Sequence, residues 1–190
     1  MMTTSDNKVY IGYHGTNYEN VESIIKHGFH VSDNTDEWLG HGIYFFTEGI
    51  SDPIENAKEW AINQAWDKVA KRYLYQKYAV LKVEVSGKRV LDLTTTNGLK
   101  VYNQMRDFLI NKYVRTLRGK KRDFHQENCE IHNLIMQEFQ TDILLSHLYI
   151  KNSIQRKHRI WSNVPNVTVM VVKKTQNIIS TQIETSGEIL

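Results

Sequence analysis

The order of strand-like and helix-like segments constrains the fold of this chain more than any other feature. Short β-branched or alternating segments predict strands, and longer segments with apolar residues at helical spacing predict helices. Strands are predicted at residues 9–13, 43–46, 78–85, 89–93, 159–162, 167–172 and 178–183. Helices are predicted at residues 19–27, from 53 to about 72, at 99–117 and at 124–139. Because strands and helices are segregated rather than strictly alternating, we expect an α+β fold and not a doubly wound parallel sheet.

Local signals define some of these boundaries. Asn17 is a possible N-cap for helix 19–27, because its side-chain oxygen can accept a hydrogen bond from the first helical turn. Gly28 is well placed to end the same helix. Residues 89–93 follow strand 78–85 after a glycine, and we expect the two segments to pair as a hairpin.

Composition places the chain among ordinary globular proteins. Its 190 residues fit one domain, residues 1–190, with 41% hydrophobic and 24% charged residues. The apolar runs last only a few residues, and the polar N-terminus lacks the apolar core of a signal peptide. A single cysteine, Cys129, excludes an internal disulfide framework. These features favour a cytoplasmic protein without membrane contact, while export without a cleaved signal stays open.

Two glycine motifs carry the residues with the clearest chemistry. In residues 13–16 (Tyr-His-Gly-Thr), His14 can offer one ring nitrogen to a ligand hydroxyl, and Gly15 lets a planar amide approach the backbone closely. In residues 40–46 (Gly-His-Gly-Ile-Tyr-Phe-Phe), a flexible turn leads into an aromatic strand that presents Tyr44 on one face. Each motif by itself is weak evidence for a binding site. A nucleotide with two flat rings, however, requires both aromatic surfaces for stacking and backbone groups that are exposed at glycine.

The joint pattern resembles a known family. His-Gly-Thr at 14–16, His-Gly-Phe at 27–29 and Trp-Leu-Gly-His-Gly-Ile-Tyr-Phe-Phe at 38–46 resemble the histidine–tyrosine class of ADP-ribosyltransferases, the branch of diphtheria toxin and the poly(ADP-ribose) polymerases (PARPs). The resemblance is clearest over residues 10–61. It implies a PARP-like fold, a split antiparallel β-sandwich with flanking helices, and NAD bound as substrate between the two halves.

The resemblance also implies roles for particular residues. His14 would hold the adenosine-side ribose hydroxyl, Gly15 the nicotinamide carboxamide through its backbone, and Tyr44 would stack on the nicotinamide ring. Trp60, in a helix of small residues, is the candidate for the second face of that ring, although a tryptophan of the core is an equally good interpretation. The NAD-binding residues implied in this way are His14, Gly15, Thr16, Gly42, Tyr44 and Trp60.

The third signature residue of the family, often a glutamate early in a C-terminal strand, is missing. Residues 166–172 contain no carboxylate, and Thr168 takes the equivalent position, with Asn166 as the alternative. With His14 and Tyr44, Thr168 completes the predicted catalytic set. A threonine cannot act as a general base near neutral pH, which favours transfer of one ADP-ribose over polymer formation. It also leaves open a binding-only sensor of NAD or ADP-ribose, and carboxylates elsewhere, such as Glu130, Glu138 and Glu184, could substitute.

Basic clusters suggest the acceptor. Residues 112–122 contain six basic residues and no acidic one, and a second cluster covers residues 156–159. Such patches attract phosphate backbones, although a solvated loop is the plainer interpretation. The predicted nucleic-acid-binding residues are Lys112, Arg115, Arg118, Lys120, Lys121 and Arg122.

By resemblance, a small single-domain member is expected to be a bacterial toxin of a toxin–antitoxin or phage-defence system, restrained by an antitoxin. RNA or single-stranded DNA is the preferred acceptor over protein. No metal is expected. His125, Cys129 and His132 share a helix face, but without a fourth ligand they are interpreted as a partly buried polar stripe.

Overall fold

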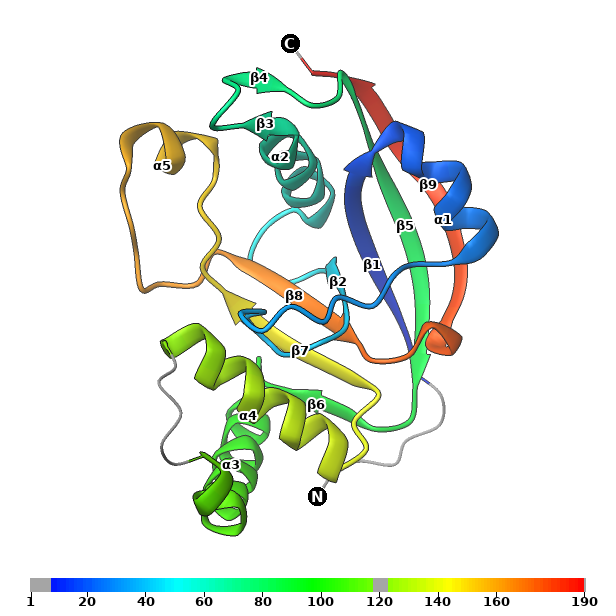
Figure 1. The fold of residues 1–190 in the computed structure, drawn as a ribbon. Coiled ribbons are helices and arrows are strands. Elements are labelled where there is room, and N and C mark those ends of the chain that lie inside the picture. The colour runs from blue at the N-terminus through cyan, green and yellow to red at the C-terminus, as the bar shows by residue number, and fades with distance from the viewer. Residues whose placement is uncertain (1–7, 118–122, 190) are drawn as a thin grey trace.

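The chain folds as an α+β protein around one mixed β-sheet, as the computed structural model shows for residues 8–117 and 123–189 (Figure 1). The order of the seven strands in this sheet is β6-β7-β8-β2-β1-β5-β9. Their bounds are Lys8–Asn17 (β1), Ile43–Phe46 (β2), Lys77–Gly87 (β5), Val90–Asp92 (β6), Ile143–Leu148 (β7), Val167–Val172 (β8) and Ile178–Glu188 (β9). The expected α+β class is confirmed.

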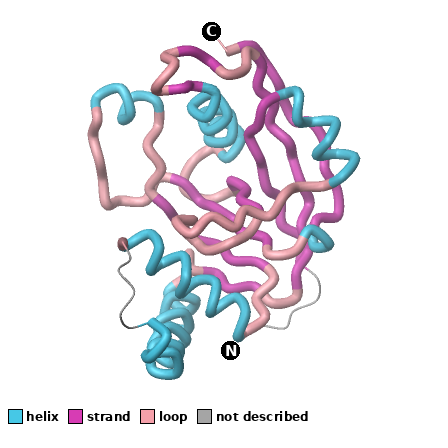
Figure 2. Tube along the Cα trace, in the orientation of Figure 1, coloured by secondary structure: helices cyan, strands magenta, loops and turns pink. Residues whose placement is uncertain are grey.

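Helices cover the sheet and extend one end of it. Their bounds are Val21–His27 (α1), Pro53–Ala65 (α2), Thr96–Leu117 (α3), Phe124–Glu138 (α4) and Ser153–His158 (α5), with 3₁₀ turns at Tyr18–Asn20 (η1) and Thr175–Asn177 (η2). A small hairpin, β3 (Trp66–Asp67) and β4 (Arg72–Tyr73), follows α2. Figure 2 shows α3 and α4 as the pair of long helices at one end of the molecule. Among the described residues, no helix has both the length and the apolar character of a membrane span.

The sheet is nearly divided at its middle. Strand β1 pairs with β5 along its whole length, but β1 and β2 register at a single position, Tyr13 opposite Phe46. On one side lies the group β1, β5 and β9, and on the other β2, β8, β7 and β6 (Figure 1). The two groups therefore diverge beyond the Tyr13–Phe46 pair, and the edges of β1 and β2 become available for other contacts.

Hydrophobic clusters pack on both faces of the sheet. On one face, side chains of α2, α3 and α4 pack against alternate residues of β2 and β8, among them Phe46 and Val169. On the other face, Val21 and Phe29 pack against the opposite set, among them Phe45 and Met170. This alternation follows from the two-residue period of a strand, and in β8 it places Val169 and Met170 on opposite faces of the sheet.

Several predicted boundaries are confirmed by the structure. The Asn17 side chain accepts a hydrogen bond from Glu19 N at 3.1 Å and caps η1, which leads directly into α1. Gly28 ends α1 with a φ of 84°, a conformation that side chains with a Cβ disfavour. The strand at 43–46 has the predicted bounds.

Three local predictions are wrong. The helix from Pro53 ends at Ala65 instead of near residue 72, because the backbone becomes extended at Trp66 and turns into the β3–β4 hairpin. Residues 89–93 contain β6, which pairs in parallel with β7 and not with β5. Residues 159–162 form no strand, because Arg159 ends α5 in the left-handed region, with φ 55°.

Candidate functional site

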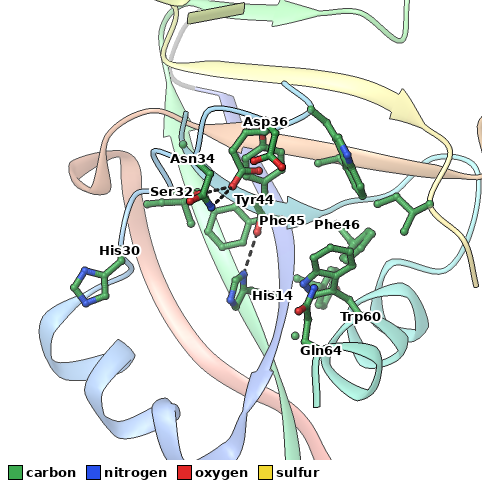
Figure 3. Close-up of a pocket in the computed structure, with 18 residues that line it drawn as sticks. His14, His30, Ser32, Asn34, Asp36, Tyr44, Phe45, Phe46, Trp60 and Gln64 are labelled. Carbon is green, nitrogen blue, oxygen red and sulfur yellow. Dashed lines mark hydrogen bonds between the residues drawn. The ribbon is translucent and has the colours of Figure 1, made fainter. Parts of the chain in front are cut away.

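A cavity of about 420 Å³ opens where β1 and β2 diverge (Figure 3). It is closed on one side by α2 and on another by the loop between α1 and β2, residues 28–42, which Figure 2 shows crossing the sheet. Five predicted NAD-binding residues line this cavity together: His14, Gly15, Gly42, Tyr44 and Trp60. The structure thus brings together residues from three separate segments of the chain: β1, residues 42–44 and α2.

His14 is held in one orientation by the neighbouring strand. Its Nδ1 lies 3.0 Å from the backbone oxygen of Tyr44, at the point where the β1–β2 ladder has opened. A carbonyl oxygen can only accept, so Nδ1 carries the proton and Nε2 of the neutral ring is an acceptor. Burial between the rings of Phe29 and Phe45 lowers the pKa of His14, so the ring is neutral at pH 7. His14 can therefore accept a hydrogen bond from a ligand hydroxyl.

Tyr44 offers its ring and not its hydroxyl. The hydroxyl donates to Gly40 O at 2.6 Å and accepts from Leu39 N at 2.9 Å. Burial raises the pKa of the Tyr44 phenol well above its ordinary value, so it is un-ionised at neutral pH. Because both hydrogen bonds go to the turn that precedes β2, the ring plane is fixed at the cavity wall.

Gly15 and α2 form the opposite wall. A Cβ on Gly15 would lie 1.8 Å from the backbone oxygen of Ala57, so β1 and α2 approach each other as closely as a glycine permits. This contact brings Trp60 into the cavity, where it makes an edge contact with Trp38 at 5.9 Å between ring centroids. Trp60 also packs against the core, as the alternative interpretation expected. Its contact with a nicotinamide ring stays a prediction.

The rim of the cavity contains residues that sequence reasoning missed. Ser32 donates to the Glu37 carboxylate, and Asn34 Nδ2 donates to the same carboxylate at 3.2 Å. Paired backbone hydrogen bonds of 3.0 Å join Ser32 to Gly42. This network fixes the loop that carries Trp38 and Asp36 into the cavity. Trp38 belongs to the motif that carried the family resemblance, so its aromatic side chain could have marked it in the sequence as a residue of the binding site.

Thr168 lies away from the cavity. It is 3% exposed, accepts a hydrogen bond from Ile50 N at 3.1 Å, and is joined to His147 Nδ1 at 3.0 Å. The two-residue period of β8 turns Thr168 to the face opposite Val169, and Val169 lines the cavity. The structure therefore does not bring the predicted third catalytic residue to His14 and Tyr44.

The remaining predicted residues near the cavity have structural partners. Asn166 exchanges two hydrogen bonds of 2.8 Å with the backbone of Ile150. Thr16 Oγ1 accepts from Asn20 Nδ2 at 3.4 Å and does not line the cavity. The cavity takes its carboxylates from the rim, from Asp36 and Glu37. The substitutes named from the sequence, Glu130, Glu138 and Glu184, are not among its lining residues.

The basic run at 112–122 is only partly within the described residues. Lys112 of α3 forms an ion pair with Glu138 of α4, which neutralises one of the predicted nucleic-acid contacts. Arg115 belongs to α3, and its side chain lies outside the described part of the structure, as do Arg118, Lys120, Lys121 and Arg122. The rest of this predicted interface stays a prediction.

The stripe on α4 is partly buried, because His125 is exposed and the other two residues pack inward. Cys129 and His132 are buried, and His132 lies against the Tyr102 ring with 5.2 Å between centroids. Burial lowers the pKa of His132 and raises the pKa of Cys129. Within the described residues, no group of three or more histidine, cysteine, aspartate or glutamate side chains is placed to hold a metal ion.

The geometry of this cavity is the basis on which a function can be assigned. It joins a neutral histidine acceptor, a fixed tyrosine ring and two tryptophans around a volume suited to a small organic ligand. No protein-family model matches the sequence, and no curated protein matches it.

Proposed function

We propose that this protein binds NAD in the cavity between β1 and β2 and transfers a single ADP-ribose from it. The observation that carries the proposal is the meeting of His14, Tyr44 and Trp60 at one cavity from β1, β2 and α2. These residues were selected from the sequence for opposite ends of one dinucleotide, and their convergence is the arrangement that NAD binding requires. The near-division of the sheet at this point supports a PARP-like fold.

Three parts of NAD have a matching group in the cavity. A ribose hydroxyl on the adenosine side donates to His14 Nε2, whose acceptor state is set by the Nδ1 hydrogen bond to Tyr44 O. The nicotinamide ring stacks on the fixed ring of Tyr44, with Trp60 towards its other face. Its carboxamide hydrogen-bonds the β1 backbone at Gly15, beyond the last registered pair with β2.

The chemistry follows from holding NAD at both ends. The bond between the nicotinamide nitrogen and ribose C1′ breaks, the electron pair leaves with neutral nicotinamide, and C1′ becomes oxocarbenium-like. A nucleophile on the acceptor forms the new bond to C1′ and releases its proton to solvent. Contacts made to both ends in a bent cofactor are used in the transition state, and the aromatic walls exclude competing water.

The acceptor that we propose is nucleic acid, either RNA or single-stranded DNA. We propose that the protein acts as a toxin that an antitoxin restrains.

A second function has its own supporting observation. The β8 residue facing the cavity is Val169, which supplies neither a base nor a hydrogen bond to a ribose hydroxyl. A protein that binds NAD or ADP-ribose as a sensor, without turnover, needs no such group.

Incubation with adenine-labelled NAD and total cell extract separates these functions. RNA, DNA and protein fractions are analysed for label, and released nicotinamide is measured. Label in a nucleic-acid fraction supports the proposal, and label in protein alone supports a protein acceptor. NAD binding without nicotinamide release supports the sensor. The inactive control is the double variant His14→Ala/Tyr44→Ala, and the matched active control is His27→Ala at the exposed end of α1.

A further inference from the structure

A second cavity, of about 380 Å³, adjoins the first. The two share Phe46, Trp60 and Ile150 as lining residues, so a group bound in one lies beside a group bound in the other. The second cavity lies between α2 and the segment around α5, residues 149–165, which we call the α5 segment. In Figure 1 this segment forms a separate loop at the side of the molecule, beyond the end of β7.

The α5 segment is strongly basic. It contains no aspartate or glutamate, and its lysines and arginines are Lys151, Arg156, Lys157 and Arg159. None of these four takes part in the ion pairs found among the described residues. Arg156 Nε donates to Lys151 O at 2.9 Å, which holds both residues at the mouth of the second cavity. Desolvation and the neighbouring Arg156 lower the pKa of Lys151, as expected for cations gathered without an anion.

An exposed aromatic surface accompanies these charges. Trp161 is 75% exposed, and Lys151 Nζ lies 3.8 Å from the centre of its ring. Tyr149 lies beside it, with 6.1 Å between ring centroids. Proteins that bind single strands combine a basic groove for phosphates with aromatic rings on which bases stack. Four cations that take part in none of the described ion pairs, one of them 3.8 Å from an exposed indole, favour a polyanion that also carries flat rings.

The α2 wall of the second cavity carries three carboxylates, each with a contact inside the protein. Asp52 caps α2, accepting from Ile54 N at 2.8 Å, and Glu55 is paired with Lys58 at 3.0 Å. Glu59 accepts a hydrogen bond from Ser153 Oγ at 3.0 Å, which ties the α5 segment to α2. Among these contacts only Glu55 is paired with a cation, so Asp52 and Glu59 keep their negative charge. We therefore expect the phosphates of a bound strand on the α5 side of the cavity, away from α2.

We propose that the second cavity and the α5 segment form the acceptor site, and that they bind single-stranded nucleic acid. One base stacks on Trp161, the flanking phosphates contact Lys151, Arg156 and Lys157, and the next nucleotide enters the second cavity beside the NAD site. This inference rests on the proposed function. It places the acceptor on the α5 segment, whereas the sequence had indicated residues 112–122.

The test measures oligonucleotide binding without NAD, by fluorescence anisotropy of a labelled 12-nucleotide RNA, the same sequence as DNA, and the DNA duplex. Trp161→Ala is expected to weaken single-strand binding about tenfold. The triple variant Lys151→Gln/Arg156→Gln/Lys157→Gln is expected to lower the salt dependence of log K by about 2, because each lost phosphate contact removes about 0.7. The matched control, Lys26→Gln/Lys88→Gln/Lys174→Gln, removes three exposed charges elsewhere and is expected to bind normally.

Failure of this inference is distinguishable from failure of the proposed function. NAD binding is measured separately on the same variants by calorimetry. If the Trp161→Ala variant and the triple variant bind single strands with wild-type affinity, the proposed acceptor site is overturned. It is also overturned if the control triple variant loses as much single-strand affinity as the test triple variant. Both conclusions hold whether or not the variants bind NAD. Preference for duplex over both single strands would also overturn it. Preference between RNA and DNA identifies the acceptor, and either one supports the proposal.

Discussion

The contact between Gly15 and α2 gives the sharpest prediction about how the fold sets the site. In Gly15→Ala the new Cβ would lie 1.8 Å from Ala57 O, whereas ordinary contact begins at 3.4 Å, so β1 and α2 must separate by the difference, about 1.6 Å. The opposing atom is a backbone oxygen, which cannot rotate away. We therefore expect a cost at the upper end of overpacking, about 3 kcal/mol, and a fall in Tm of about 6–12 °C.

The same movement should weaken NAD binding. Because α2 carries Trp60, the separation displaces that ring relative to Tyr44 and removes a stacking contact of about 1 kcal/mol, or about fivefold in Kd. The assay is thermal unfolding followed by NAD calorimetry at a temperature where every variant is folded.

A matched control separates the two effects. Gly98 of α3 makes an equally close approach, since its Cβ would lie 1.6 Å from Asp92 O, and Gly98 does not line the cavity. We expect Gly98→Ala to lose comparable stability and to keep wild-type NAD affinity. A wild-type Tm for Gly15→Ala, or equal losses of NAD affinity in both variants, would refute this reasoning.

Three further predictions concern the cavity itself. Tyr44→Phe should lose about 1–3 kcal/mol of stability in urea unfolding, because the buried backbone groups of residues 39 and 40 lose their hydrogen-bond partner. Its Kd for NAD should stay within about threefold of the wild-type value. Unchanged stability would contradict the structural role of the hydroxyl. NAD affinity should be constant from pH 7 to 8. At pH values below 6.5 it should decrease as the pH passes the lowered pKa of His14, because Nε2 is then protonated and becomes a donor. The same pH profile in a His14→Gln variant would contradict this explanation. Trp38→Ala and Trp60→Ala should each weaken NAD binding, and a double-mutant cycle should give a coupling of about 0.5–1.5 kcal/mol, whereas strict additivity would show that the rings act independently.

Sequence reasoning was reliable where the local pattern and the tertiary contacts agree. Asn17, Gly28 and the strand at 43–46 are set by capping and alternation, and all three were predicted correctly. The hairpin at 66–73 and the parallel pairing of β6 with β7 depend on distant partners, which no local pattern contains. The strand β7 itself was missed for the same reason.

The site shows the same limit at the level of single residues. His14, Gly15 and Tyr44 could be named as candidates because the two short motifs that contain them are visible in the sequence. The structure places His14 and Gly15 inside β1 and not at a turn. The position of Thr168 depends on the register of β8 against β2, and a shift of one residue exchanges the two faces of a strand. The acidic rim and the aromatic α5 segment reach the cavities only through the folding of long loops, so neither could be placed from the sequence.

The most direct test of the account is a calorimetric titration of NAD into the wild-type protein and into His14→Ala and Tyr44→Ala. The account predicts one NAD per chain for the wild type and at least tenfold weaker binding in both variants, whose side chains line a single cavity. Absence of NAD binding by the wild-type protein, or equal affinity in all three proteins, would contradict it.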